Sequence, residues 1–510
     1  MAEPETNSSE SVPSPEPTQV KTKSKRYVGS RETLAYILFD VAASVGIGKQ
    51  GGEFTDRILN ISKGWQAAVT PITTAWDIIN DLFVAAFVEK TRTRFGKFRP
   101  WLIAYPIYGI PMTMMSYLLP YIFWGTDAGF LPKIITWAVL NMFNEMTGTL
   151  NGICRTGMVV NITPDPGERL LLINKANFWS MFGEELPQQI FSILMDVIAR
   201  QTAKFTKEMI NLKMRRWFLI FGEGTIIISG LFSLWFAWVS RERVVGTEQS
   251  REKPPTIRES FIALRKNRPL FMLMISEILG GFSIKGQMST YTNSILNFRN
   301  FGTVMGIPGA PISYIAYAWV PPLRRKFSTK FLWLAGNHIM QPFNIIIYFL
   351  GLIRRKGQPL FLQLVPMLII YAVYNCIHMC VWPLNKVIGE EIRNECIDYG
   401  EWKSGMRSEA MVGTLRSFPS KITNAVGSTV TNAIMEMIGF QTGLDYNNQS
   451  EKTAQGVFAM ATIIPTLSGL IGLIPKLFFN INQKDREQMY AELAERRARI
   501  AAEMNAQIGE

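Results

Sequence analysis

The chain has 510 residues, of which 48% are hydrophobic and only 18% are charged, and its formal net charge is +13. A soluble chain of this length is expected to form two or three domains with about 25% charged residues, so the composition argues against a soluble protein. The basic residues recur in short clusters between apolar stretches and form no single patch, which argues against nucleic-acid binding. The composition indicates a protein embedded in a lipid bilayer.

The elements follow in chain order. Residues 1–32 are rich in Pro, Ser and Glu, then basic, and lack the apolar segment of a signal peptide, which predicts a disordered cytoplasmic tail. A bilayer core about 30 Å thick requires about 20 apolar residues per helix. On that criterion we expect twelve spans, at 33–54, 66–88, 100–123, 132–160, 172–199, 217–240, 270–297, 306–323, 331–353, 359–388, 410–438 and 456–480.

The polar segment 241–268, predicted to be a cytoplasmic loop, divides the spans into two six-helix halves, 33–240 and 269–480. The charged segment 481–510 is predicted to form a cytoplasmic helix. Basic residues are concentrated in the connections at 89–99, 241–268 and 324–330, which predicts that both termini lie inside the cell. Two connections on the opposite side, 200–216 and 354–356, are also basic, so the bias is not uniform.

A faint repeat relates the halves. VEKTRTRFGKFRPW (88–101) follows the second span of the first half, and VPPLRRKFSTKFLW (320–333) follows the second span of the second half. Equivalent basic loops in two six-helix halves are typical of alternating-access transporters. A repeat-derived protein without a transport role is the alternative.

The second span contains two acidic residues, Asp77 and Asp81, one helical turn apart and therefore on one face, with Asn80 near it. Two neighbouring carboxylates in the hydrocarbon layer are costly unless a cation, a proton or water compensates them. Carboxylate and amide oxygens are the hard ligands that sodium prefers, by the logic that governs calcium and magnesium. The alternative is an ordinary ion pair with a basic residue elsewhere.

Lys421 lies in the predicted eleventh span, about one turn after Arg416. A buried lysine requires a counter-ion, and the two carboxylates are the obvious partners. The ammonium would then replace the cation when it leaves and couple ion occupancy to conformation. Alternatively, the side chain extends to the membrane interface.

Further polar residues in spans are candidates for lining a hydrated central cavity, although each is equally consistent with a contact between helices. Those we select as candidate substrate contacts include Asp40, Asn151 and Arg155, and Trp382 is a candidate for stacking against a sugar ring. The sequence shows no zinc-ligand spacing, P-loop, catalytic triad or nucleotide fingerprint, so we expect neither an enzyme nor a cofactor.

Two charged segments carry a family resemblance. WDIINDLFVAAFVEKTRTRFGKFRPW (76–101) and IDYGEWKSGMRSEA (397–410), the latter expected as a loop between the tenth and eleventh spans, resemble the hallmarks of the glycoside–pentoside–hexuronide:cation symporters. YILFDVAAS (36–44) is a third, weaker match. The resemblance runs from about residue 33 into the C-terminal tail. It implies the all-α major facilitator fold and transport of sugars with sodium, protons or lithium.

Carried over residue by residue, the resemblance places cation ligands at Asp77, Asn80, Asp81 and Thr149, and the coupling lysine at Lys421. The sugar site matches less well. An acid and a tryptophan of the melibiose carrier fall on Gly152 and Thr156, and its fifth-span arginine falls on Asn177, which we keep as a substrate candidate. The solute therefore stays open.

Loop residues are candidates for a cytoplasmic gate closed by salt bridges, although a solvated loop explains each of them as well. These are Arg92, Arg94, Lys97 and Arg99, with Asp398 and Glu401 as partners. We expect a monomeric symporter in the cell membrane that moves a sugar or glycoside with sodium or protons. The alternatives are a proton-coupled carrier of another solute and a membrane sensor that binds its ligand without moving it.

Overall fold

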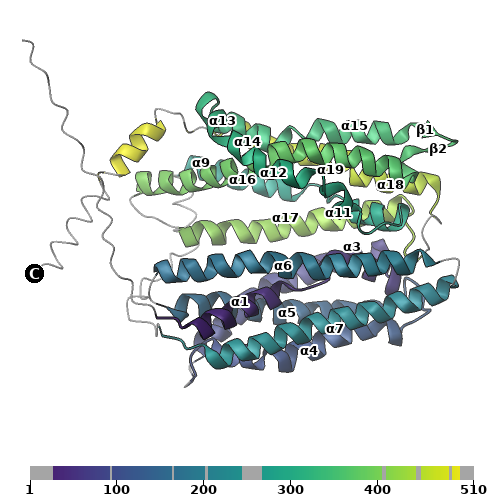
Figure 1. The fold of residues 1–510 in the computed structure, drawn as a ribbon, viewed down its shortest axis with the longest axis horizontal. Coiled ribbons are helices and arrows are strands. Elements are labelled where there is room, and N and C mark those ends of the chain that lie inside the picture. Colours follow the sequence, from purple (N-terminus) through teal and green to yellow (C-terminus); the bar gives the residue numbers. More distant parts are fainter. Residues whose placement is uncertain are drawn as a thin grey trace, which may run out of the picture.

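The described part of the chain is almost entirely helical. The computed structural model describes residues 27–91, 93, 95–163, 166–201, 205–243, 267–404, 409–443, 449–479, 481, 485–493 and 495. In Figure 1 the elements from α1 to α7 form one group of helices and those from α9 onward form a second group beside it. The expected central loop, 241–268, lies outside the described residues except at its two ends.

The first half contains six helical spans, of which the first is interrupted. Its elements are α1 (Ser30–Ser44), η1 (Gly48–Gln50), α2 (Gly51–Glu53), η2 (Phe54–Ile58), α3 (Lys63–Lys90), α4 (Arg99–Ile122), α5 (Leu131–Ile162), α6 (Pro166–Ala199) and α7 (Lys207–Val239). The break follows Ser44, where Val45 turns to an extended conformation with ψ 121°, so the predicted continuous helix 33–54 was wrong. Glycines at 46 and 48, which weaken helices, follow directly.

The second half is more fragmented. Its elements are α9 (Arg268–Gly281), α10 (Met288–Thr290), η5 (Tyr291–Ile295), α11 (Phe301–Gly306), α12 (Gly309–Ala316), η6 (Tyr317–Trp319), α13 (Val320–Lys326), α14 (Thr329–His338), α15 (Gln341–Leu352), β1 (Arg354–Arg355), β2 (Gln358–Pro359), η7 (Leu360–Leu362), α16 (Leu364–Ser404), α17 (Glu409–Met437), α18 (Glu451–Ala461), α19 (Ile463–Gly469), η8 (Leu470–Gly472) and α20 (Leu473–Leu477). The short antiparallel hairpin β1–β2 pairs Arg354 with Pro359 and Arg355 with Gln358.

The tenth span extends beyond its predicted end. Helix α16 continues to Ser404, so the start of the motif expected as a loop, 397–404, is helical. Two contacts hold the helix just before this segment: Asn267 donates a hydrogen bond of 2.7 Å to the carbonyl of Cys396, and Arg486 forms an ion pair with Glu395. Arg486 belongs to the helical residues 485–493, part of the predicted C-terminal helix.

A structural repeat relates the two interrupted spans. FTDRILN (54–60) and YTNSILN (291–297) each begin with one wide helical turn of π type, η2 and η5. Each ends on an asparagine with positive φ, 53° at Asn60 and 49° at Asn297. Asparagine tolerates this left-handed conformation better than most residues do. The two halves therefore share a local backbone feature.

The halves meet along α3 and α17, which pack against each other across the boundary. Each half has its own buried core, with Phe39 stacked on Phe236 in the first and Phe361 stacked on Phe458 in the second. Within the described residues, four segments are long and apolar enough to cross a bilayer by composition alone: Arg99–Ile122, Glu208–Val239, Leu364–Gly389 and Glu451–Leu477.

Candidate coupling site and solute cavity

Asp77 and Asp81 lie at the boundary between the halves. They are carried by α3, which begins after Ser62, whose side chain accepts a hydrogen bond from the backbone N–H of Trp65. This helix contacts α17 of the other half and α5 of its own. The side chain of Asp77 is 22% exposed and that of Asp81 is 38% exposed. Both carboxylates thus lie between helices and stay within reach of water.

One lysine joins both carboxylates. Lys421 of α17 places its Nζ 3.0 Å from Oδ2 of Asp77 and donates a hydrogen bond to Oδ2 of Asp81. Thr149 of α5 donates a hydrogen bond of 3.0 Å to the other oxygen of Asp81. The structure therefore brings four of the five residues predicted for the coupling site together, from three helices and both halves.

Among the described side chains, the charges in this cluster do not balance. Two carboxylates and one ammonium leave one negative charge, and Glu145 lies within electrostatic range of Asp77, Asp81 and Lys421. Glu145 precedes Thr149 by one turn of α5, and this spacing was the signal in the sequence that could have added it to the site. The donor set of carboxylate and hydroxyl oxygens fits a hard cation.

Asn80 lies in the neighbouring position of α3 and is 3% exposed. Its amide Nδ2 has no hydrogen-bond partner among the described residues. A buried amide without a hydrogen-bond partner is energetically costly. In native proteins such an amide is often explained by an ion or a water molecule that binds there. Its predicted role as a cation ligand stays a prediction.

Four of the five candidate substrate contacts lie in the first half. Asp40 of α1 forms an ion pair with Arg155 of α5 and accepts a hydrogen bond of 2.7 Å from Ser180 of α6. Asn151 lies one turn before Arg155 on α5, and Asn177 lies three residues before Ser180 on α6. Asp40 is buried, whereas Arg155 is half-buried and keeps part of its guanidinium available.

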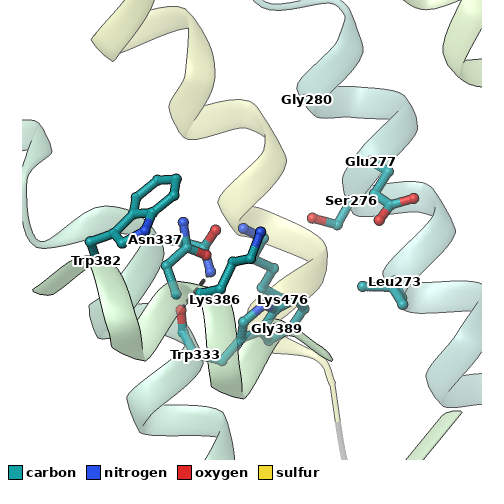
Figure 2. Close-up of a pocket in the computed structure, with 11 residues that line it drawn as sticks. Leu273, Ser276, Glu277, Gly280, Trp333, Asn337, Trp382, Lys386, Gly389 and Lys476 are labelled. Carbon is teal, nitrogen blue, oxygen red and sulfur yellow. Dashed lines mark hydrogen bonds between the residues drawn. The ribbon is translucent and has the colours of Figure 1, made fainter. Parts of the chain in front are cut away.

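The fifth candidate, Trp382, lies in the other half. It lines a cavity of about 400 Å³ between α9, α14, α16 and α20. Figure 2 shows Trp382 and Lys386 on one side of this cavity, with Ser276 and Glu277 of α9 on the opposite side. Sequence reasoning selected the tryptophan but missed the charged residues around it.

The predicted gate residues are only partly described. Arg92 and Arg94, and the side chain of Glu401, lie outside the described residues. The backbone N–H groups of Lys97 and Arg99 donate hydrogen bonds of 2.8 and 3.0 Å to Glu242, which follows the end of α7. Arg99 Nε also donates a hydrogen bond to the carbonyl of Ala237 in α7. Both residues thus anchor the loop to their own half. Pairing with Asp398 or Glu401 stays a prediction.

At the opposite end, a buried charge network closes the two halves together. Arg299, between η5 and α11, donates a hydrogen bond of 2.7 Å from Nε to Glu53 and one of 3.2 Å from Nη1 to Asp196. The side chain of Arg299 is 0% exposed, that of Glu53 4% and that of Asp196 8%. Asn300 also binds Asp196, through its backbone N–H at 3.0 Å and its Nδ2 at 2.9 Å.

An amide pair lies beside this network: Asn293 Nδ2 donates to Oε1 of Gln50 at 3.1 Å. We refer to Gln50, Glu53, Asp196, Asn293, Arg299 and Asn300 together as the inter-half seal. Further contacts between halves lie at the same end, from Gly64 to Glu436 and from Thr442 to Asn60.

The seal, next to α11, and the start of α1 lie at opposite ends of the helices (Figure 1). Among the contacts between described residues, the hydrogen bonds that join the halves occur at the sealed end or at Lys421. The protein is therefore closed at the end remote from the start of α1.

Comparison with known proteins assigns the chain to a family. Residues 32–483 match the family profile described as MFS/sugar transport protein. The chain belongs to this family. One relative is an Escherichia coli protein provisionally assigned as a 2,3-dihydroxypropane-1-sulfonate exporter, 22% identical over 91% of this chain and 95% of that protein. Others are the isoprimeverose transporter of Lactiplantibacillus pentosus, 21% identical over 96% of each chain, and the glucuronide carrier protein homolog of Escherichia coli, 20% identical over 92% and 96%.

The solved structure of a bacterial homologue of the human lysosomal transporter Spinster has the same fold, with a TM-score of 0.52 and 14% identity over 88% of this chain and 94% of that one. Membership of the MFS/sugar transport family makes this chain a multi-pass membrane transporter and not an enzyme. The predicted major facilitator fold and the resemblance to glycoside–pentoside–hexuronide:cation symporters are thus confirmed.

Proposed function

We propose that this protein is a symporter that moves a sugar or sugar derivative together with sodium or a proton. The observation that carries the proposal is the contact of one lysine, Lys421, with both Asp77 and Asp81. The two acids come from one half and the lysine from the other, so the electrostatics of the site depend on how the halves are arranged.

Coupling follows from competition at the two carboxylates. A sodium ion or proton that binds Asp77 and Asp81 weakens their attraction for Lys421, because it supplies the positive charge that the ammonium supplied before. The free energy of the contact between α3 and α17 then depends on whether a cation is bound. A cation that favours one arrangement of the halves also favours the solute that binds that arrangement, and differential affinity is all that coupling requires.

Two further features support the rest of the proposal. The relatives with the isoprimeverose and glucuronide names are sugar or sugar-derivative carriers by description. Basic residues in the loops at 89–99, 241–268 and 324–330 favour a cell-membrane orientation with both termini in the cytoplasm. In that orientation the inter-half seal faces outward and the structure is inward-facing.

The test uses purified full-length protein and its Asp81→Asn variant. The thermal midpoint is measured at constant ionic strength in choline, sodium and lithium chloride, each at two pH values. Sodium at about 100 times its Kd stabilises a folded protein by about 2.7 kcal/mol, so the wild type should show a clear rise in midpoint that Asp81→Asn lacks. The matched control is Glu451→Gln, an exposed acid far from the site that should keep the full response.

Flux separates a carrier from a sensor. In proteoliposomes, an imposed sodium or proton gradient should drive accumulation of a bound sugar by the wild type but not by Asp81→Asn. Sodium stimulation retained in Asp81→Asn would refute the cation site. Binding without flux would identify a sensor, and a response to pH alone would identify the proton as the coupling ion.

A further inference from the structure

Another cavity lies between the two halves, beside the inter-half seal. Its volume is about 450 Å³, within the range of small-molecule sites. One wall comes from the first half, through Gln50 and four residues of α6 between 185 and 192. The other wall comes from residues of the second half between 288 and 306, in η5, α11 and their flanks. We refer to this space as the amide cavity.

The lining of the amide cavity is mostly uncharged. Its polar groups are four carboxamides, four hydroxyl groups and two charged side chains, Glu185 and Arg299. Arg299 is 0% exposed and bound to Glu53 and Asp196, so its charge is already compensated. Glu185 would repel an anion. Carboxamides and hydroxyl groups both donate and accept hydrogen bonds. The lining therefore suits an uncharged ligand with several hydroxyl groups.

Hydrogen bonds join the two walls of the amide cavity. Thr303 of α11 donates one to Oε1 of Gln189 on α6. Asn293 donates one of 3.1 Å to Gln50, which in turn donates one of 2.9 Å to Ser192 of α6. These bonds fix the orientation of the amides and hydroxyl groups, as a specific binding site requires.

Two glycines leave room on the α11 side. Gly302 and Gly306 both line the amide cavity, and a Cβ atom on either of them would meet no atom of another element within 4 Å. They are four residues apart and therefore lie on one face of the helix. A larger side chain at either position would occupy the cavity without clashing with the fold.

The amide cavity shares part of its wall with the inter-half seal, because Gln50, Asn293 and Arg299 belong to both. Gln188 lies eight residues before Asp196 on α6, or about 12 Å along the helix axis, so the cavity extends from the seal toward the middle of the helices. Its two walls belong to different halves and separate if the halves part at this end. A ligand bonded to both walls therefore binds the sealed arrangement more tightly and stabilises it.

We propose that the amide cavity binds an uncharged, hydroxylated ring of the solute through Gln188, Gln189 and Thr303, and that the bound ring holds the sealed end closed. This inference rests on the proposed function and adds to it the place of the solute and the arrangement that the solute favours. The cation then acts on the contact between α3 and α17, and the solute acts on the contact between α6 and α11. Both ligands bias the same rearrangement of the halves, so their binding is coupled.

The test measures binding to the purified full-length protein in sodium chloride by calorimetry. The probes are methyl glucoside, methyl galactoside and methyl xyloside, with methyl glucuronide as the acidic counterpart of the first. Gly306→Leu should weaken binding of the neutral probes at least about tenfold, because its side chain fills the cavity. Thr303→Val should weaken it about fivefold, the size expected for one neutral hydrogen bond, and Thr303→Ser should retain wild-type affinity.

The matched control is Gly224→Leu in α7. Gly224 is half-buried like Gly306 and also has open space at its Cβ, but it lies outside the amide cavity, so the variant should bind the probes as the wild type does. No binding of any neutral probe by the wild type, or unchanged affinity in Gly306→Leu and Thr303→Val, would overturn the proposal. Tighter binding of methyl glucuronide than of methyl glucoside would also contradict it.

The effect on the sealed end is read at a cysteine outside the amide cavity. Thr442 contacts Asn60 across the halves, and Thr442→Cys is made in a background in which Cys376 and Cys380 are replaced by serine. A saturating neutral probe should slow labelling of this thiol by a membrane-impermeant maleimide, and Gly306→Leu should abolish the effect. Unchanged or faster labelling would refute the closing role of the solute.

Gradient-driven accumulation of the bound probe is measured separately in proteoliposomes. Accumulation by the wild type together with undiminished binding in Gly306→Leu would sink the cavity assignment and leave the proposed function intact. Binding that responds to the variants as expected, without accumulation in any gradient, would instead refute the proposed function and support the cavity as a binding site.

Discussion

Removal of Arg299 should open the end of the protein that the inter-half seal closes. Its guanidinium is fully buried and bonded to Glu53 and Asp196. Arg299→Gln therefore leaves two buried carboxylates with the weaker contact of Arg57, whose Nη1 lies 3.9 Å from Glu53, as their remaining ion pair. Breaking a buried ion pair by removing one partner costs about 3–5 kcal/mol. In the opposite arrangement of the halves these carboxylates would be hydrated. Most of the cost therefore falls on the closed arrangement, and the equilibrium should shift by a factor on the order of 100 or more.

A buried cysteine reports this shift. Thr292 is 5% exposed at the sealed end, and Thr292→Cys introduces a thiol there. The two partly accessible native cysteines, Cys376 and Cys380, are replaced by serine, and the other two are buried. The rate of labelling by a membrane-impermeant maleimide should be at least about tenfold higher with Arg299→Gln than without it, because a thiol reacts only when it is accessible.

The matched control is Arg354→Gln, which breaks an exposed ion pair with Glu451. The side chains of that pair are 64% and 51% exposed, and such pairs contribute about 0–1 kcal/mol, so labelling should not change. Gel filtration confirms that each variant remains folded. Equal labelling rates in Arg299→Gln and Arg354→Gln would refute the reasoning that burial of these charges holds the sealed end closed.

Three other variants test separate features. Lys421→Gln should bind sodium about tenfold more tightly, because the competing ammonium is gone, and should lose gradient-driven accumulation of the solute. Isothermal titration measures the sodium affinity and a flux assay measures accumulation. An unchanged sodium affinity would contradict competition between the lysine and the cation. Gly96→Ala should lower the free energy of unfolding by about 1–2 kcal/mol, because Gly96 has φ 106° and a Cβ would lie 2.4 Å from the Glu242 carboxyl carbon. A fall in the thermal midpoint would report this loss of stability. Asp40→Asn should weaken solute binding by freeing Arg155, with sodium affinity unchanged; a parallel loss of sodium affinity would place the pair in the cation site instead.

The sequence alone predicted the architecture because its signals are local. Apolar segments of about 20 residues indicate spans wherever they occur, and the basic loops at 88–101 and 320–333 revealed two halves. The acids at 77 and 81 were conspicuous for the same reason: a charge in an apolar helix is costly, so its position alone makes it informative.

The tertiary structure decided which charges meet. Lys421 was expected near the two acids, and its contact with both of them depends on the packing of α17 against α3. Glu53 was assigned no role from the sequence, and nothing near it in the chain pointed to Arg299, which lies 246 residues away. The residues next to a buried charge in the sequence do not reveal which distant charge it pairs with.

The cavity in the second half shows the same limit. Trp382 was a candidate from its residue type, but Lys386, Lys476 and Glu277 belong to three helices that come together only in the fold. Local hydrophobicity and helix periodicity thus determine where the chain crosses the membrane and which residues are costly there. Only the packing of helices determines which of those costly residues neutralise one another and which remain available for an ion or a solute.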